Sequence, residues 1–243
     1  MQGFDIDSLL RFTPPEFMCE RCCGLIVNVQ PNASRWRCPV CDEDYLSTDE
    51  YPTALEAMRA RGMQLAFHDL VAHSQKLARV ARNTRASMMK RNPSYPPLRA
   101  LFETLASAEK FIHFSTYGIS AMLLGALKMA SLRVDVRGVV SGVKNDALYK
   151  ELTGYTNETP RLNLRVYNGE SAYFPHQKIV VVDGLMAFKG SANLTDFGWR
   201  RAAYGREVIE AVTDIDEVIG LNNRFFSPVW LAEPALDAPE GMD

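Results

Sequence analysis

The stretch His176–Asn193 reads HQKIVVVDGLMAFKGSAN, and it combines two short apolar runs with a set of polar side chains. Successive side chains in a β-strand point to opposite faces. If the first run is a strand, His176 and Lys178 share one face, while Ile179 and Val181 point to the other face and can be buried. The pattern therefore predicts a strand that serves the core with one face and presents an imidazole and an ammonium group on the other.

Ser191 and Asn193 stand in the same relation, two residues apart, at the end of the second apolar run. If the two strands pair, these side chains converge with His176 and Lys178, and Gly190 lets a ligand approach the backbone closely. A lysine ammonium group and neutral serine and asparagine donors suit the oxygens of a phosphate. Histidine, with an ordinary pKa of about 6.5, can act there as a nucleophile or as an acid and base. No carboxylate cluster surrounds the histidine in the sequence, so these residues favour phosphoryl transfer without Mg²⁺ or Ca²⁺.

The same stretch resembles the motif of the phospholipase D superfamily, H-x-K-x4-D-x6-G-S-x-N. All of its fixed positions match without a gap, at His176, Lys178, Asp183, Gly190, Ser191 and Asn193. A chain of ordinary composition would contain such a match by chance with odds on the order of one in 10⁵ to 10⁶. The resemblance covers about residues 97–230, because the strand–helix–strand pattern of 110–141 is similar to the first half of this family's domain.

The resemblance implies a mechanism and a role for the matched residues. His176 would attack phosphorus and form a covalent phosphohistidine, which water then hydrolyses. Lys178, Ser191 and Asn193 would hold the phosphate oxygens. A histidine from a second copy of the motif would protonate the leaving oxygen.

Two acidic positions complete the site that the resemblance implies. Asp183 would support the site structurally rather than attack the substrate. A downstream acid would orient His176 through its second ring nitrogen, and Glu207 is the candidate, with Glu210 as the alternative. The interval from Asn193 to Glu207 is a few residues longer than in the most compact members of the family.

The chain contains a single copy of the motif, since the nearest imitation, at His113, lacks the lysine. A site that needs two histidines must then come from two chains, so the resemblance implies a homodimer with the site at its two-fold axis. We expect His68 and His73 to be structural residues of a long helix. We expect His113 to be a strand histidine that faces the core or the surface.

The pattern after residue 97 predicts an α/β domain. Helical patterns occupy 98–109, 120–130 and 145–154, and strand patterns alternate with them at 110–119, 132–141 and 162–168. Strands at 176–183, 185–191 and 207–214 and a helix at 215–226 follow. Early βαβ units followed by consecutive strands indicate a mixed β-sheet flanked by helices, as expected for a phospholipase D-like domain at 97–230.

A long basic amphipathic helix is predicted in the region 53–96, before this domain. Its mostly apolar stripe follows three- and four-residue spacing, through Phe67, Leu70, Ser74, Leu77, Ala81, Thr84 and Met88. Arg79, Arg82 and Arg85 lie off the stripe. The prolines of NPSYPP, at 92–97, end the helix because proline cannot continue the hydrogen-bond ladder.

Residues 1–50 contain a cysteine module and an acidic linker. Cys19-x2-Cys22 and Cys38-x2-Cys41 are two pairs separated by 15 residues, a spacing typical of a tetrahedral Zn²⁺ site. Iron in a rubredoxin-like site is the alternative to Zn²⁺. Cys23 is interpreted as a spare thiol, and the alternative is that Cys19 pairs with Cys23. The segment is too short to bury its own core, so metal must supply much of its folding energy. The module resembles a zinc ribbon, whose closed site is structural.

Arg35, Trp36 and Arg37 come directly before the second cysteine pair. They suit contact with a nucleic-acid strand. The alternative is that Trp36 packs on the metal module.

Composition and charge narrow the classes of function. With 243 residues, 47% of them hydrophobic, the chain has ordinary globular composition, and no run of about 18 apolar residues predicts a membrane span. The net charge of −2 divides into −5 over 1–52, +7 over 53–230 and −4 over the tail 231–243, which we expect to be disordered. A basic block suits a polyanionic substrate, although a solvated surface explains it equally well. The N-terminus MQGFDIDSLLRF does not resemble a secretory signal, so the sequence predicts a cytoplasmic protein with reduced thiols.

Together these features predict a metal-independent nuclease that acts on DNA or RNA as a homodimer. By analogy with small nucleases of this kind, we expect a role in restriction or phage defence, within a larger defence or DNA-processing complex and without a membrane partner. The first alternative is a phospholipid hydrolase or phosphatidyl transferase. The second is a non-catalytic zinc-ribbon subunit that binds nucleic acid or protein.

Overall fold

The computed structural model describes residues 17–26, 35–46, 67–90, 94–141, 152, 159, 161–167 and 178–232. Several predictions from the sequence fall outside these residues. They are the first part of the long helix at 53–66, the helix at 145–154 except for Leu152, and most of the acidic tail. The predicted nucleophile, His176, also lies outside the described residues.

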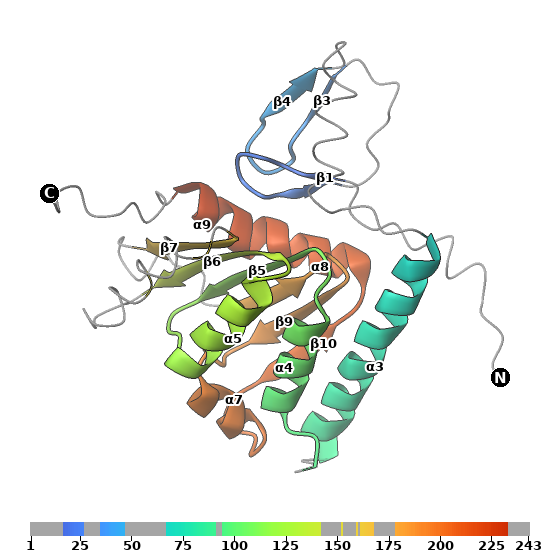
Figure 1. Ribbon diagram of the computed structural model, residues 1–243, viewed down its shortest axis with the longest axis vertical. Coiled ribbons are helices and arrows are strands. Elements are labelled where there is room, and N and C mark those ends of the chain that lie inside the picture. Colours follow the sequence, from blue (N-terminus) through green and yellow to red (C-terminus); the bar gives the residue numbers. More distant parts are fainter. Residues whose placement is uncertain are drawn as a thin grey trace, which may run out of the picture.

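A six-stranded mixed sheet with the order β10–β9–β8–β5–β6–β7 forms the centre of the larger domain (Figure 1). Its strands are β5 (Phe111–Thr116), β6 (Asp135–Ser141), β7 (Leu162–Tyr167), β8 (Lys178–Val182), β9 (Met186–Gly190) and β10 (Ile209–Val212). β5, β6 and β7 are parallel, whereas β8 is antiparallel to β5 and continues as an antiparallel meander into β9 and β10. Every strand lies within its predicted range, and the predicted mixed α/β fold is confirmed.

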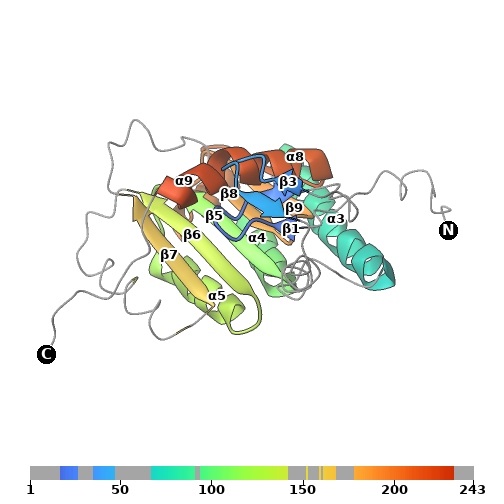
Figure 2. The same ribbon diagram turned by 90° about the horizontal axis from the view of Figure 1, so that it is seen from above.

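Helices cover both faces of the sheet, as the two views show (Figures 1 and 2). One face packs against α3 (Phe67–Lys90), α4 (Pro97–Ser107), α5 (Ala121–Ser131) and α7 (Asp196–Ala202). The other packs against α8 (Ile215–Leu221), the π-helix η3 (Asn222–Phe226) and α9 (Ser227–Ala232). Because both faces are covered, the central strands are buried on both sides and have near-continuous apolar sequences.

Strand β8 illustrates this double burial. Ile179 and Val181 join the core beneath α8, as the alternation predicted. Val180 and Val182 join the opposite core, with Phe188 of β9. Lys178, at the start of β8, is therefore the one polar residue among the described residues of this strand.

Helix α3 lies within the region 53–96, and part of the predicted apolar stripe falls on residues whose burial is described. Leu77, Ala81 and Thr84 are buried. The arginines at 79, 82 and 85 are exposed on its outer side.

Two helical features differ from the prediction. The single helix expected at 215–226 is instead an α-helix followed by a π-helical turn and a further α-helix that reaches Ala232. The sequence pattern did not predict α7, whose seven residues are too few for a clear periodic signal. Its start is marked by Thr195, whose Oγ1 accepts a hydrogen bond from the Gly198 amide at 3.0 Å.

The cysteine module lies at one end of the larger domain (Figure 1). It contains two small antiparallel sheets, one of β1 (Phe17–Met18) with β2 (Leu25–Ile26) and one of β3 (Arg35–Arg37) with β4 (Asp44–Leu46). No helix among the described residues is long and apolar enough to span a membrane.

Candidate active site and metal centre

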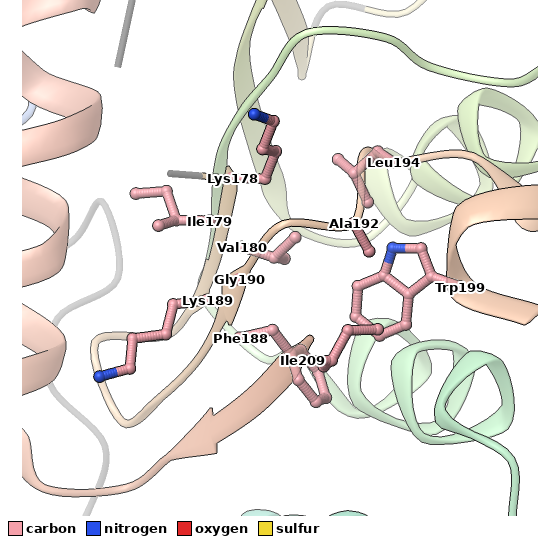
Figure 3. Close-up of a pocket in the computed structure, with 10 residues that line it drawn as sticks. All are labelled: Lys178, Ile179, Val180, Phe188, Lys189, Gly190, Ala192, Leu194, Trp199 and Ile209. Carbon is pink, nitrogen blue, oxygen red and sulfur yellow. The ribbon is translucent and has the colours of Figure 1, made fainter. Parts of the chain in front are cut away.

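The register of the β8–β9 hairpin brings the two ends of the opening motif together. Lys178 begins β8 and pairs directly with Gly190, the last residue of β9. Ser191 and Asn193 follow Gly190 at once, so they leave the sheet beside Lys178. Figure 3 labels Lys178 and Gly190 on the two strands, with the Trp199 side chain on the side of α7.

Lys178 is 8% exposed, and its ammonium group lies 4.6 Å from the centre of the Tyr117 ring. Burial lowers the pKa of Lys178, and the negative charge of Glu207 opposes this effect by favouring the ammonium form. A partly desolvated cation of this kind interacts strongly with an anion, because little water screens it. The position suits a group that binds phosphate.

Glu207 is held at the same place by Ser191. The Ser191 hydroxyl donates to Glu207 Oε2 at 2.6 Å and accepts from the Val208 amide at 3.0 Å. The Ser191 amide in turn donates to the Val208 carbonyl at 3.1 Å. These bonds fasten the residues after β9 to the residues before β10.

Glu210, the alternative candidate, points elsewhere. It pairs with Lys189 across β9 and β10, and its Oε2 lies 3.1 Å from the Lys189 ammonium group. Lys189 also binds Glu217 of α8 at 2.6 Å. The structure thus places Glu207 with Lys178 and Glu210 toward the layer of α8.

Gly190 and Asn193 complete the described part of the site. Gly190 has φ 155°, and a Cβ atom there would lie 2.0 Å from the Val208 carbonyl oxygen. A side chain would therefore separate β9 from the residues that position Glu207. The Oδ1 atom of Asn193 is buried and has no hydrogen-bond partner within the described part of the chain, so it is available to a ligand donor.

Asp183 lies at the opposite end of β8, in the turn that joins it to β9, and is not brought to Lys178. Its carboxylate accepts hydrogen bonds from the amides of Glu109, Lys110 and Phe111, at 2.8–2.9 Å. His73 of α3 adds a further contact, with Nε2 2.7 Å from Asp183 Oδ2. These bonds tie the β8–β9 turn to α3 and to the start of β5.

His113 is fully buried on β5 and faces the layer of η3. Its Nδ1 lies 2.8 Å from Asn222 Oδ1, and its ring stacks on Phe226 at 4.4 Å. Burial lowers the pKa of His113 to about 3, so the imidazole is neutral at ordinary pH. The expected strand histidine is a core histidine.

The four predicted metal ligands Cys19, Cys22, Cys38 and Cys41 form a cluster in which all sulfur atoms lie within 4.8 Å of one another. Sulfur pairs are 3.5 and 3.7 Å apart. Tetrahedral Zn–S bonds of about 2.3 Å require S···S separations of about 3.8 Å, so the cluster fits a metal ion of this size.

Hydrogen-bond donors around the sulfur atoms also suit thiolate ligands. The amide of Gly24 donates to Cys22 Sγ at 3.3 Å, and the hydroxyl of Tyr45 donates to Cys19 Sγ at 3.1 Å. Such donors stabilise negative sulfur. The N-terminal module therefore has the cysteine arrangement of a zinc-type site, as predicted.

Cys23 lies outside this cluster and faces the larger domain. It is fully buried, burial raises the pKa of its thiol, and Arg137 of β6 donates to its sulfur at 2.8 Å. Its carbonyl accepts from Asn222 Nδ2 at 3.0 Å. Cys23 therefore belongs to the contact between the module and the sheet domain.

Arg37 forms an ion pair with Asp44 of the neighbouring strand, at 2.8 Å. The prediction that 35–37 contacts a nucleic-acid strand stays a prediction.

The sequence pattern did not identify Tyr117 and Asn222 as supporting residues, and it predicted a structural role for His73 without naming its partner. Each is connected to a predicted residue that is distant in the sequence, by contacts to Lys178, Cys23 and Asp183 respectively. The one signal that the sequence offered for Tyr117 is its place near the end of the predicted strand 110–119.

Comparison with known families supports this description. Residues 101–227, just over half of the chain, match the family model described as "Cardiolipin synthase, PLD-like domain". The fold and the motif-bearing hairpin thus define a phospholipase D-like phosphodiesterase domain. The chain belongs to the phospholipase D superfamily.

Solved structures with a similar fold include the phospholipase D family member Nuc from Salmonella typhimurium. Nuc is 20% identical, with a TM-score of 0.45 over 56% of this chain and 87% of Nuc. NucT from Helicobacter pylori is 17% identical, with a TM-score of 0.47 over 62% of this chain and 93% of NucT. The archaeal chromatin protein TrmBL2 is 14% identical, with a TM-score of 0.41 over 83% of this chain and 76% of that protein. No curated protein matches the sequence.

Proposed function

We propose that this protein is a metal-independent nuclease that cleaves phosphodiester bonds of DNA or RNA through a covalent phosphohistidine at His176. The observation that carries the proposal is the intact motif of 176–193, in which the register of the hairpin brings Ser191 and Asn193 to the end of the sheet where Lys178 lies. Glu207 is held at the same end by Ser191.

The proposed reaction has two steps. One His176 nitrogen attacks phosphorus, the bond to the leaving oxygen breaks, and the partner subunit's His176 gives that oxygen a proton. Water then attacks the phosphohistidine, the partner subunit's His176 takes up the water proton, and the N–P bond breaks to release a phosphate monoester. Lys178 and the amide of Asn193 stabilise the phosphate oxygens in both steps. Glu207 is the acid that orients His176.

The assignment to nucleic acids rests on the distribution of charge. The block 53–230 carries a net charge of +7, and α3 exposes Arg79, Arg82 and Arg85 on its outer side. A surface of this kind attracts the continuous phosphate backbone of a nucleic acid. Phospholipid hydrolysis or phosphatidyl transfer uses the same chemistry at phosphorus and is the second candidate, favoured by the family description that residues 101–227 match.

We further propose that the site is shared by two chains, because the sequence contains one motif and the reaction needs two histidines. The ion held by the cysteine cluster is proposed to be a structural Zn²⁺. Its four thiolate ligands leave no position for substrate. Restriction or phage defence remains the proposed cellular role, by analogy alone.

The decisive experiment compares the wild-type chain with His176→Ala on labelled single- and double-stranded DNA and RNA, and on phosphatidylglycerol vesicles, in excess EDTA. Cleavage of nucleic acid by the wild type alone is the expected result. Equal activity of both proteins, or activity that requires added Mg²⁺, contradicts the phosphohistidine mechanism. Turnover of the lipid alone assigns the protein to the second candidate function. Metal content is measured in parallel, because prolonged chelation removes ions from thiolate sites.

A further inference from the structure

The chain from 194 to 208 leaves the candidate active site and returns to it. It begins after Asn193, and at its end Val208 exchanges hydrogen bonds with Ser191. The two strands that it connects are paired, with Gly190 opposite Ile209. The segment is therefore fixed at both ends to the residues proposed to hold phosphate.

The inner side of this segment is anchored in the core. Trp199 of α7 is 2% exposed and packs edge-on against Phe188 of β9, with ring centres 5.2 Å apart (Figure 3). Gly198 and Ala202 are also buried. The orientation of α7 is thus set by packing, and its other side must face solvent.

The segment carries two exposed aromatic rings, Phe197 in α7 and Tyr204 in the turn after it, which we call the aromatic platform. Phe197 is 65% exposed and Tyr204 is 74% exposed. Among the side chains whose exposure the structure describes, no other aromatic residue is as exposed. The two rings lie within a few residues of Asn193 and Glu207 in the chain, on a segment that is fixed to the candidate site at both ends.

Three arginines belong to the same segment as the platform, and one of them contacts a platform ring. Arg201 places its guanidinium group 5.2 Å from the centre of the Phe197 ring. The Arg200 side chain is 63% exposed, and Arg206 is exposed next to the candidate Glu207. We call Arg200, Arg201 and Arg206 the arginine rim.

We propose that the segment 194–208 binds a single-stranded stretch of nucleic acid, with unpaired bases on the aromatic platform and phosphates on the arginine rim. Stacking on exposed rings combined with basic side chains along the backbone is how proteins hold single strands. In a duplex, neighbouring base pairs already cover the faces of each base, so the platform has no face to bind. The inference rests on the proposed function and specifies its substrate as single-stranded or locally unpaired.

Charge favours a nucleic acid over a second copy of the chain as the occupant. In a symmetric dimer the same surface occurs on both sides of the interface, so the arginine rim would face its own copy. Like charges that meet in this way oppose association. A strand of phosphates complements the rim instead.

The test measures binding separately from cleavage. In the His176→Ala background, fluorescence anisotropy reports the affinity for a labelled single-stranded DNA, the RNA of the same sequence, and a blunt DNA duplex. We expect Phe197→Leu and Tyr204→Leu each to weaken single-strand binding about tenfold, since each removes a ring on which a base can stack. Phe197→Tyr and Tyr204→Phe keep the rings and should retain the affinity. Met129→Ala in α5 and Leu132→Ala directly after that helix change exposed apolar side chains away from the segment and are the controls.

The inference is overturned if the leucine variants bind the single strand as tightly as the parent chain does. It is also overturned if the variants weaken duplex binding equally, or if the parent chain binds no single strand. Loss of dimer in sizing experiments, with affinity retained, assigns the platform to a protein interface and also overturns it. Failure of the proposed function looks different. The platform would then bind single strands in a ring-dependent manner, while the wild type cleaves none of them.

Discussion

Asp183, in the turn of the β8–β9 hairpin, and Glu207, just before β10, have different surroundings and therefore different expected roles. Asp183 is enclosed by backbone amides and His73, with a side chain 1% exposed. Glu207 lies beside Lys178 and accepts from Ser191. Asp183 has no further lone pair to offer a substrate, so its contribution is to hold the fold.

Asp183→Ala should lower the free energy of unfolding by about 3–5 kcal/mol, because it leaves several buried donors without an acceptor. Chemical denaturation provides the measurement. Asp214→Ala is the control, since Asp214 caps α8 through the exposed Glu217 amide and its loss should cost about 1 kcal/mol. If the two variants lose similar stability, the anchoring role of Asp183 is wrong.

Glu207→Gln should move the alkaline limb of the kcat/KM profile to lower pH. Burial lowers the pKa of Lys178, and Glu207 counteracts this effect. Removing the negative charge lets that pKa fall further, so the ammonium form needed for phosphate binding is lost at a lower pH. Glu210→Gln changes a residue paired with Lys189 and should leave the limb in place. An identical limb in wild type and Glu207→Gln refutes the coupling.

At the scale of elements, the π-helix η3 connects the cysteine module to the sheet. Its first two residues face the module. Asn222 binds the Cys23 carbonyl, and Asn223 binds both backbone groups of Leu25, at 2.7 and 2.8 Å. The Asn223 side chain thus pairs with the amide and the carbonyl of Leu25, as the backbone of a neighbouring β-strand would. π-Helical turns often occur where a helix must present side chains that a regular helix would misplace.

Asn223→Ala should loosen the module without unfolding the sheet. The variant removes both hydrogen bonds to Leu25, which together contribute about 1–3 kcal/mol. Amide hydrogen exchange over 17–26 should accelerate roughly 10- to 100-fold, while exchange in β5 and β8 stays slow. Arg224→Ala, on the same helical turn, is the control. Equal protection of 17–26 in both variants would show that the contact contributes nothing.

At the scale of the whole molecule, the proposed active site requires two chains. Mixing inactive His176→Ala chains with the wild type, after subunits have exchanged, distinguishes a shared site from independent sites. A shared site needs both histidines, so activity should fall with the square of the wild-type fraction. A linear fall, or an active strict monomer in sizing experiments, contradicts the shared site.

The cysteine module should depend on its metal, since it buries little apolar surface of its own. We expect one Zn²⁺ per chain by mass spectrometry of metals. Cys38→Ser should lose the ion and the exchange protection of 17–26 and 35–46, while the central sheet stays folded. Metal-free protein that keeps this protection would show that packing alone folds the module.

The sequence by itself determined the features that depend on residues close together in the chain. Short apolar and β-branched runs located all six strands, and the spacing of His176, Lys178, Ser191 and Asn193 indicated a phosphate site. Cysteine spacing likewise indicated the metal cluster, because ligand geometry is encoded in short turns.

Only the tertiary structure decided which distant residues meet. The register of β9 with β10 separates Glu207 from Glu210, although the two stand three positions apart in the chain. Packing of Trp199 turns the outer side of α7 to solvent, and the docking of η3 brings Asn223 to Leu25. Pairing and packing act across long intervals of chain, where a local pattern carries no information on partners. For that reason the motif could be recognised from its residues, while the surface beside it became visible only in the folded protein.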